Sequence, residues 1–206
     1  MKNEYVFEKG THYSKGKKEQ PTMWPLLLLT VGIILQFVHG VAIWYSLACY
    51  SAAIASYWYI CGRLKYTYMR VVFDQSCQYS IDGPDAFDIN KLFGIGFGDH
   101  MNRSARFGWN CLDGKIWIYA YVHNEGKMES KRMLSCLCDD PVDLRLKITD
   151  HAYEFTSSTR SGERTKESFP RRRSWVTDLM VHRLFPYFGG NKTAPHGMKL
   201  EMTAVH

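Results

Sequence analysis

The sequence has little proline and few cysteines, and one long segment of it carries no charged residue. Six cysteines among 206 residues are too few for the dense disulfide scaffold of a small secreted domain. Seven prolines and 16 glycines exclude a collagen-like or proline-rich filament. The net charge of +6 is mild, so it fits an acidic ligand or an anionic surface, and we expect no nucleic acid as a partner.

The uncharged segment runs from Gln20 to Gly62 without Asp, Glu, Lys or Arg. A bilayer core is about 30 Å thick and a helix rises about 1.5 Å per residue, so one span needs roughly 20 residues. The segment therefore has room for two spans, and His39-Gly40 is the natural break between them. We predict a two-helix transmembrane hairpin over residues 23–62, preceded by a cytoplasmic tail of residues 1–22.

Basic residues flank this segment on both sides, at Lys15–Lys18 before it and from Arg63 after it. Positive flanks favour the cytoplasmic side, so we expect a multi-pass protein of the inner membrane with both termini cytoplasmic. The lipid bilayer is then a partner. Small residues between Ser46 and Ser56 favour close helix packing, which predicts a homo-oligomer formed through the membrane helices.

Residues 63–206 show the two-residue period of β-strands. From Lys115 to Val122, aliphatic residues alternate strictly with Trp117, Tyr119 and Tyr121, and turn residues lie on both sides. Strands at such short spacing predict a cytosolic antiparallel β-sandwich of the jelly-roll kind, or a barrel. The fold class expected for the whole chain is thus a membrane α-hairpin followed by an all-β domain.

Thr156–Arg173 interrupts the strand pattern with Ser, Thr and basic residues, and we expect a mobile basic loop there. It is either a solvated hairpin tip or a contact for anionic lipid or phosphate, since basic segments bind anionic surfaces. The basic residues of this segment are Arg160, Arg164, Lys166, Arg171, Arg172 and Arg173.

Two other segments are candidates for a ligand site. An arginine beside aromatic rings suits a sugar, a base or a phosphate, unless the aromatic stripe is the core face of its strand. The glycine pair at Gly189-Gly190 offers amides to an anion, or simply forms a tight loop. The predicted ligand-binding residues are Arg106, Trp109, Trp117, Tyr119, Tyr121, Asn191 and His196.

Motifs for chemistry are scarce. Cys136-Leu137-Cys138 has no second ligand pair at metal-binding spacing, so we expect no metal. The sequence contains no P-loop and no G-x-S-x-G elbow. We therefore expect no cofactor and no evident catalysis.

The sequence contains the strings NKLFG (90–94), SARFGW (104–109), YAY (119–121) and LFPYFGGNKTAPH (184–196). These four strings resemble those of a family of small β-rich bacterial proteins that has no established activity, so the resemblance implies no catalytic residues. The order of elements is similar to concanavalin-like jelly rolls. The architecture of two membrane helices before a β domain is similar to the membrane β-barrel effectors of cyclic-oligonucleotide antiphage systems.

The function predicted from these observations is a membrane-anchored β domain that acts as a ligand-binding or sensor module for a small polar ligand, either a nucleotide or a saccharide. One alternative is a membrane-disrupting antiviral defence effector that a cyclic nucleotide gates. The other alternative is a glycan-binding or glycan-processing domain.

Overall fold

The computed structural model describes residues 2–15, 30, 43–172, 178 and 180–205. The chain divides into two compact units, one formed by Met1–Lys18 with Lys65–His206 and the other by Glu19–Leu64. The described strands all belong to the first unit, together with the short 3₁₀ helices η1 (Gln75–Cys77) and η2 (Pro84–Phe87). They are β1 (Lys2–Phe7), β2 (Ser14–Lys15), β3 (Tyr66–Phe73), β4 (Asn90–Phe97), β5 (Arg103–Leu112), β6 (Lys115–Asn124), β7 (Lys127–Cys136), β8 (Val142–Ile148), β9 (Ala152–Thr159), β10 (Arg164–Pro170), β11 (Val181–Leu184) and β12 (Met198–Ala204).

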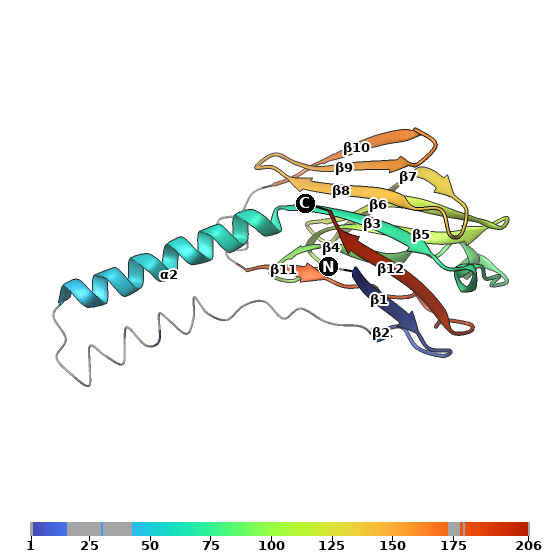
Figure 1. The fold of residues 1–206 in the computed structure, drawn as a ribbon, viewed down its shortest axis with the longest axis horizontal. Helices are drawn as coiled ribbons and strands as arrows, with labels where there is room; N and C mark the ends of the chain where they lie inside the picture. Colours follow the sequence, from blue (N-terminus) through green and yellow to red (C-terminus); the bar gives the residue numbers. More distant parts are fainter. Residues whose placement is uncertain (1, 16–29, 31–42, 173–177, 179, 206) are drawn as a thin grey trace. The chain divides into compact units, whose positions relative to one another are not determined.

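The strands form two antiparallel sheets that pack as a sandwich (Figure 1). The seven-stranded sheet has the order β10-β9-β8-β3-β12-β1-β2, and the five-stranded sheet has the order β11-β4-β5-β6-β7. The predicted all-β sandwich is therefore confirmed, and two separate sheets exclude the single closed barrel considered from the sequence.

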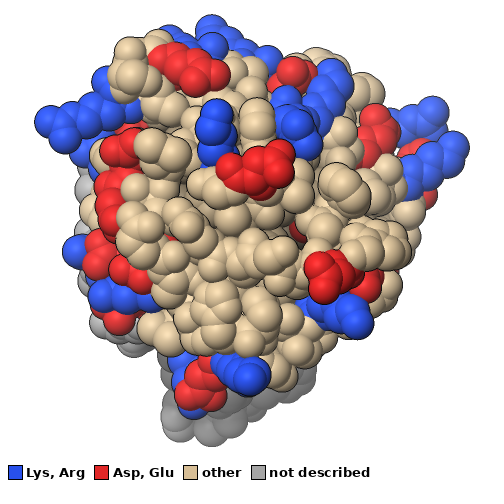
Figure 2. Space-filling model, turned by 90° about the vertical axis from the view of Figure 1, so that its right-hand side faces the viewer, with Lys and Arg blue, Asp and Glu red and all other residues tan. Residues whose placement is uncertain are grey.

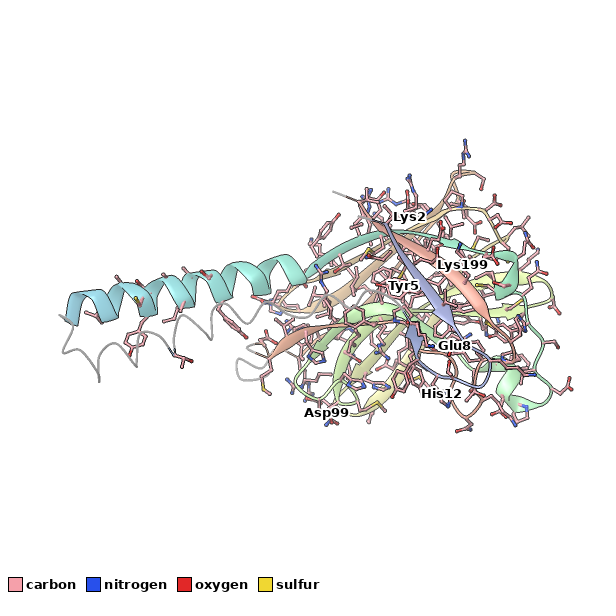
Figure 3. The ribbon with its side chains drawn as sticks, turned by 60° about the horizontal axis from the view of Figure 1, so that its bottom comes forward. Lys2, Tyr5, Glu8, His12, Asp99 and Lys199 are labelled. Carbon is pink, nitrogen blue, oxygen red and sulfur yellow. The ribbon has the colours of Figure 1, made fainter. Side chains whose placement is uncertain are left out.

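The first strand of the chain lies beside the last one. β1 pairs with β12 from Lys2 opposite Thr203 to Phe7 opposite Met198. Figure 3 shows β1 crossing the front of this unit from Lys2 to Glu8, next to the strand that carries Lys199. The segment expected to be a tail thus contributes two strands to the sandwich.

The central hairpin of the five-stranded sheet follows from its turn residues. Asp113 and Gly114 have φ angles of 52° and 69°, and they join Leu112 directly to its partner Lys115. A two-residue turn with positive φ at both positions matches the twist of the flanking strands. This turn places β5 and β6 in one continuous register.

The core lies between the two sheets and is rich in aromatic rings. The Phe73 ring of the seven-stranded sheet lies 5.1 Å from the ring of Trp109 in the five-stranded sheet. Phe107 and Phe155 make a similar contact across the sheets at 5.2 Å. On β6, Ile116 belongs to the fully buried side of the strand, so the aliphatic residues face the core.

The predicted transmembrane hairpin over residues 23–62 is wrong. In the described part of the second unit the helix is α2 (Ile43–Leu64), and the described residues contain no helix both long enough and apolar enough to cross a membrane. The first predicted span, residues 25–38, lies outside the described residues except for Thr30. The same finding contradicts the predicted location as a multi-pass protein of the inner membrane.

The physical reason is that an uncharged segment is not necessarily an apolar one. The sequence of α2 has no acidic residue, but tyrosine, tryptophan and serine make up much of it. The polar groups of these residues make transfer into hydrocarbon costly. The association of copies through Ser46–Ser56 stays a prediction.

The segment expected to be a mobile basic loop is mostly strand. β9 and β10 pair from Arg164 opposite Ser158 to Pro170 opposite Ala152, and only a short turn joins them. The exposed side of β10 carries Lys166, while Phe169 is buried. Polar residues on the solvent side of an edge strand concealed its two-residue period in the sequence.

Candidate functional site

The candidate site lies on the outer face of the five-stranded sheet, which we define as the face directed away from the core. The continuous pairing of β5 with β6 places Arg106 opposite Tyr121 and Ser104 opposite His123 on this face. The intervening residues of both strands, such as Phe107, fill the core. The alternation predicted for β6 is confirmed, and the aromatic stripe is on the outer face.

The neighbouring strand β4 presents a glycine to the arginine. Gly94 lies opposite Arg106, and a Cβ added at Gly94 would lie 2.2 Å from the Ala105 carbonyl oxygen and 2.9 Å from the Arg106 Cβ. Only glycine fits at such a distance from backbone atoms. The missing side chain therefore lets β4 come close to the backbone of β5 at Arg106.

Lys91, on the same strand, completes a basic group. A register shift in the pairing of β4 with β5 lies between Lys91 and Gly94. The Lys91 Nζ donates a hydrogen bond to the Ile89 carbonyl at 2.6 Å and lies 4.8 Å from the centre of the Tyr121 ring. Lys91 and Arg106 thus flank the same tyrosine ring.

These side chains line a pocket of about 520 Å³, which we call the outer-face pocket. Its walls come from residues distant in sequence: Tyr13 of the N-terminal segment, the stretch from Arg183 to Tyr187, and Gly189-Gly190. Backbone bridges from Tyr187 to Lys91 and from Tyr187 to Tyr13 hold these walls together. Among the described residues, no Asp or Glu lines the pocket.

Burial disfavours the charges of both cations. Desolvation, followed by repulsion from Arg106, lowers the pKa of Lys91 to about 8, although Asp88 raises it in part. Desolvation lowers the pKa of Arg106 to about 10, while Tyr121 raises it. Both groups still carry a proton at neutral pH. The Arg106 Nε atom is buried and has no hydrogen-bond partner within the described chain.

A hydrogen-bonded chain of neutral groups lies beside the cations. The Tyr121 hydroxyl is 3.1 Å from Nε2 of His123, and Nδ1 of His123 is 3.3 Å from the His100 carbonyl oxygen. Desolvation lowers the pKa of His123, and the nearby Arg106 and Lys91 lower it further, although the His100 carbonyl opposes this. Desolvation raises the pKa of Tyr121. Both groups are therefore neutral at neutral pH.

The other predicted aromatic residues are outside this pocket. Trp109 is fully buried in the core. The Arg132 guanidinium lies 4.5 Å from the centre of the Trp117 ring, and its Nε donates to the Tyr119 hydroxyl at 3.3 Å. A side chain of the protein itself thus occupies the stacking surface of Trp117 and Tyr119.

The glycine loop does not present free amides at its key positions. The Gly189 amide donates to the Asn90 side-chain oxygen at 2.5 Å, and the Asn191 amide donates to Asp88 at 3.3 Å. Nε2 of His196 lies 2.8 Å from the Ser76 carbonyl oxygen, so this histidine anchors η1. Asn191 and His196 are not among the residues that line the outer-face pocket.

The predicted anion-binding residues of the basic segment are dispersed. Arg171 is buried and pairs with Asp178, and its guanidinium lies 4.5 Å from the centre of the Phe97 ring. Arg172 is exposed and pairs with Glu125 at 3.3 Å. Arg160, Arg164 and Lys166 are exposed along the β9–β10 hairpin, and Arg173 lies outside the described residues.

At one end of the first unit, the surface charge is mixed. Figure 2 shows one end of the first unit, where acidic and basic side chains lie close together around an uncharged middle. This end therefore presents no field of a single sign, in contrast to the outer-face pocket.

Lys91, His100 and His123 line the pocket but are not among the ligand-binding residues predicted from the sequence. The two-residue period that identified Tyr121 extends to His123 on the same side of β6, so this residue was within reach of the sequence pattern. Lys91 comes from another strand and His100 from a turn, and only their placement in the sheet reveals them. The described residues contain no group of three or more His, Cys, Asp or Glu side chains that could hold a metal ion.

Comparisons with known proteins give a likeness of fold alone. No family model and no curated protein matches the sequence. The alginate lyase from Klebsiella pneumoniae is similar with a TM-score of 0.51 and 10% identity, over 68% of this chain and 59% of that chain. This chain therefore spans less than two thirds of the lyase.

Two further solved structures have lower scores. A functionally unknown protein from Saccharomyces cerevisiae has a TM-score of 0.42 and 14% identity, over 68% of this chain and 69% of that chain. The xylan beta-1,4-xylosidase from Bacillus Halodurans C-125 has a TM-score of 0.38 and 9% identity, over 68% of this chain and 27% of that chain.

Proposed function

We propose that the outer-face pocket binds a glycan that carries carboxylate groups, as in a chain of uronic acid residues. The observation that carries this proposal is the convergence of Lys91 and Arg106 in a pocket that no acidic residue lines within the described chain. Burying two cations is costly, and Asp88 offsets the cost for Lys91 only in part. An anionic ligand offsets this cost, so the pocket is built for one.

A carboxylate suits the guanidinium particularly well. Planar N–H donors of arginine match the two oxygens of a carboxylate. The buried Nε of Arg106 has no hydrogen-bond partner in the described structure, so the protein leaves at least this donor of the guanidinium unsatisfied. Lys91 supplies a second positive charge beside the Tyr121 ring.

Aromatic rings in the pocket support a sugar as the carrier of the carboxylate. Tyr13 is 69% exposed, and its ring lies 5.3 Å from the ring of Tyr187. His12 stacks on Tyr187 at 5.2 Å and fixes that ring. Tyrosine combines an apolar ring with a polar tip, which suits the mixed surface of a sugar ring.

The fold likeness is compatible with this ligand class. An alginate lyase, whose name gives alginate as what it acts on, shares the β-sandwich. The effector alternative from the sequence required the transmembrane hairpin, so we do not propose it. The ligand-binding role predicted from the sequence is kept in the narrower form of its glycan alternative.

Isothermal titration calorimetry of the full chain tests the proposal. The ligands are oligouronates, neutral glucose oligomers of equal length, and inorganic phosphate. We expect the oligouronate to bind and the neutral oligomer not to bind. Arg106→Met should weaken binding by about tenfold to a hundredfold, because a charge-assisted hydrogen bond contributes roughly 1.5–3 kcal/mol.

The matched control is Arg164→Met, which removes an exposed arginine from the other sheet. It should leave oligouronate affinity unchanged. Equal affinity for charged and neutral oligomers, or equal losses in the two variants, contradicts the proposal. Binding of phosphate without binding of oligouronate would replace the glycan by a phosphate ligand.

A further inference from the structure

Anion binding explains Lys91 and Arg106, but it gives no role to the hydrogen-bonded pair of Tyr121 and His123. We propose that this pair makes the pocket a catalytic site that cleaves 1,4-linked uronate chains by β-elimination. This inference rests on the proposed function, because it uses the same bound carboxylate.

The hydrogen bonds assign the protons of the pair. The His100 carbonyl oxygen can only accept a hydrogen bond. Nδ1 of His123, 3.3 Å away, must therefore carry a proton and donate it to this oxygen. In the neutral ring, Nε2 is then unprotonated and accepts the Tyr121 hydroxyl proton across 3.1 Å. The pair is therefore aligned to pass a proton from the tyrosine to the histidine.

Both residues are fixed in place. Tyr121 is 8% exposed and His123 is 7% exposed, and both lie on β6, which pairs with β5 along its whole length. Ser104, opposite His123, donates to the same His100 carbonyl at 2.7 Å. Sites on strands hold catalytic groups more rigidly than sites on loops do.

The composition of the pocket selects elimination over hydrolysis. Most glycoside hydrolases need two carboxyl groups about 5–9.5 Å apart, one as acid and one as base or nucleophile. Within the described chain, no Asp or Glu lines this pocket. It offers the opposite set instead, with the basic residues Lys91, Arg106 and Arg183 and a neutral tyrosine–histidine pair.

Elimination uses this set directly. Lys91 and Arg106 neutralise the uronate carboxylate and stabilise the negative charge that develops on it when the adjacent C5 loses its proton. Lys91 also lies 4.8 Å from the Tyr121 ring, so charge stabilisation and proton transfer occur side by side.

The step balances without a further reactant. The Tyr121 oxygen takes the C5 proton while its own proton moves to Nε2 of His123. The electron pair of the C5–H bond forms the C4=C5 double bond, and the C4–O bond breaks. The leaving oxygen takes a proton back through Tyr121, which restores the neutral pair. One unsaturated uronate and one new chain end result.

The full chain is incubated with an oligouronate, and the products are followed by ultraviolet absorbance and mass spectrometry. We expect the absorbance of a conjugated C4=C5 double bond. The masses of the two products should sum to the mass of the substrate, whereas hydrolysis adds one water. Deuterium at C5 should slow the reaction.

Variants separate this role from binding. Tyr121→Phe keeps the ring and His123→Gln keeps a polar side chain, so we expect kcat to fall by about 10²–10⁴-fold in each while oligouronate affinity changes little. Arg164→Met should keep both kcat and affinity. Circular dichroism checks the fold of each variant.

The outcomes are distinguishable. Binding of oligouronate without unsaturated product overturns the elimination but leaves the proposed binding function. Products that have gained water overturn it in favour of hydrolysis. Absence of binding overturns both proposals. The double bond is measured in the products that the unaltered protein forms, so the test does not depend on the folding of any variant.

Discussion

At the scale of single residues, Gly94 determines how the arginine of the pocket is placed. A methyl group at this position would lie 2.2 Å from a carbonyl oxygen of the adjacent strand, which cannot move away as a flexible side chain could. Overpacking of this kind shifts backbone and forces side chains from their preferred rotamers. The position therefore links the stability of the sheet to the geometry of the site.

We predict that Gly94→Ala lowers the free energy of unfolding by about 1–3 kcal/mol and also weakens oligouronate binding. Gly197→Ala is the matched control, because a Cβ there meets its nearest neighbour, the Phe7 carbonyl oxygen, at an ordinary 3.8 Å. Its effect should stay within about 0.5 kcal/mol. Urea unfolding measures both, and equal stabilities of the two variants would show that the strands part easily at Gly94.

At the scale of elements, the end of β10 is fixed by a buried ion pair. Arg171 follows β10 directly and pairs with Asp178, and both side chains are almost fully buried. The guanidinium also donates to the Thr149 carbonyl at 3.0 Å and covers the Phe97 ring of the opposite sheet. This arginine therefore holds the edge of one sheet against the other.

Replacing Arg171 by Met should lower the free energy of unfolding by about 3–5 kcal/mol, because it removes the cation of a buried ion pair. The adjacent Arg172→Met removes a pair whose arginine side chain is 82% exposed, which should cost about 1 kcal/mol or less. Thermal and urea unfolding compare the two. A cost for Arg171→Met as small as that for Arg172→Met would contradict the structural role of the pair.

At the scale of the whole molecule, the sequence predicts local periodicity well and long-range placement poorly. The two faces of β6 follow from alternation alone, and Asp113-Gly114 identifies the turn before it. The pocket depends on the pairing of β4 with β5 and on the bridge from Tyr187 to Lys91, which joins residues far apart in the chain. No local pattern encodes such contacts.

Two errors at this scale have physical causes. The absence of charge from Gln20 to Gly62 predicts membrane spans. The polar groups of tyrosine and serine in the same segment oppose that prediction. The β9–β10 hairpin has the sequence pattern of a loop because its outer side is basic and polar. Arg106 and Tyr121 are the predicted ligand-binding residues that line the pocket, and the two-residue period of β5 places Arg106 on the face opposite to the core residue Trp109.

The most direct measurement of the central claim is proton uptake on oligouronate binding, followed by calorimetry in two buffers of different ionisation enthalpy. In the free protein, burial and Arg106 lower the pKa of Lys91 to about 8, and Asp88 and Tyr121 lie near it. A bound carboxylate favours the charged lysine and raises this pKa. Near pH 8.5 the complex should therefore take up protons, and affinity should fall as the pH rises further.

The account predicts a binding enthalpy that depends on the buffer for the unaltered protein, and a loss of that dependence in Lys91→Met. Binding without proton uptake at this pH, or the same uptake in Lys91→Met, would contradict an anionic glycan bound beside Lys91 in the outer-face pocket.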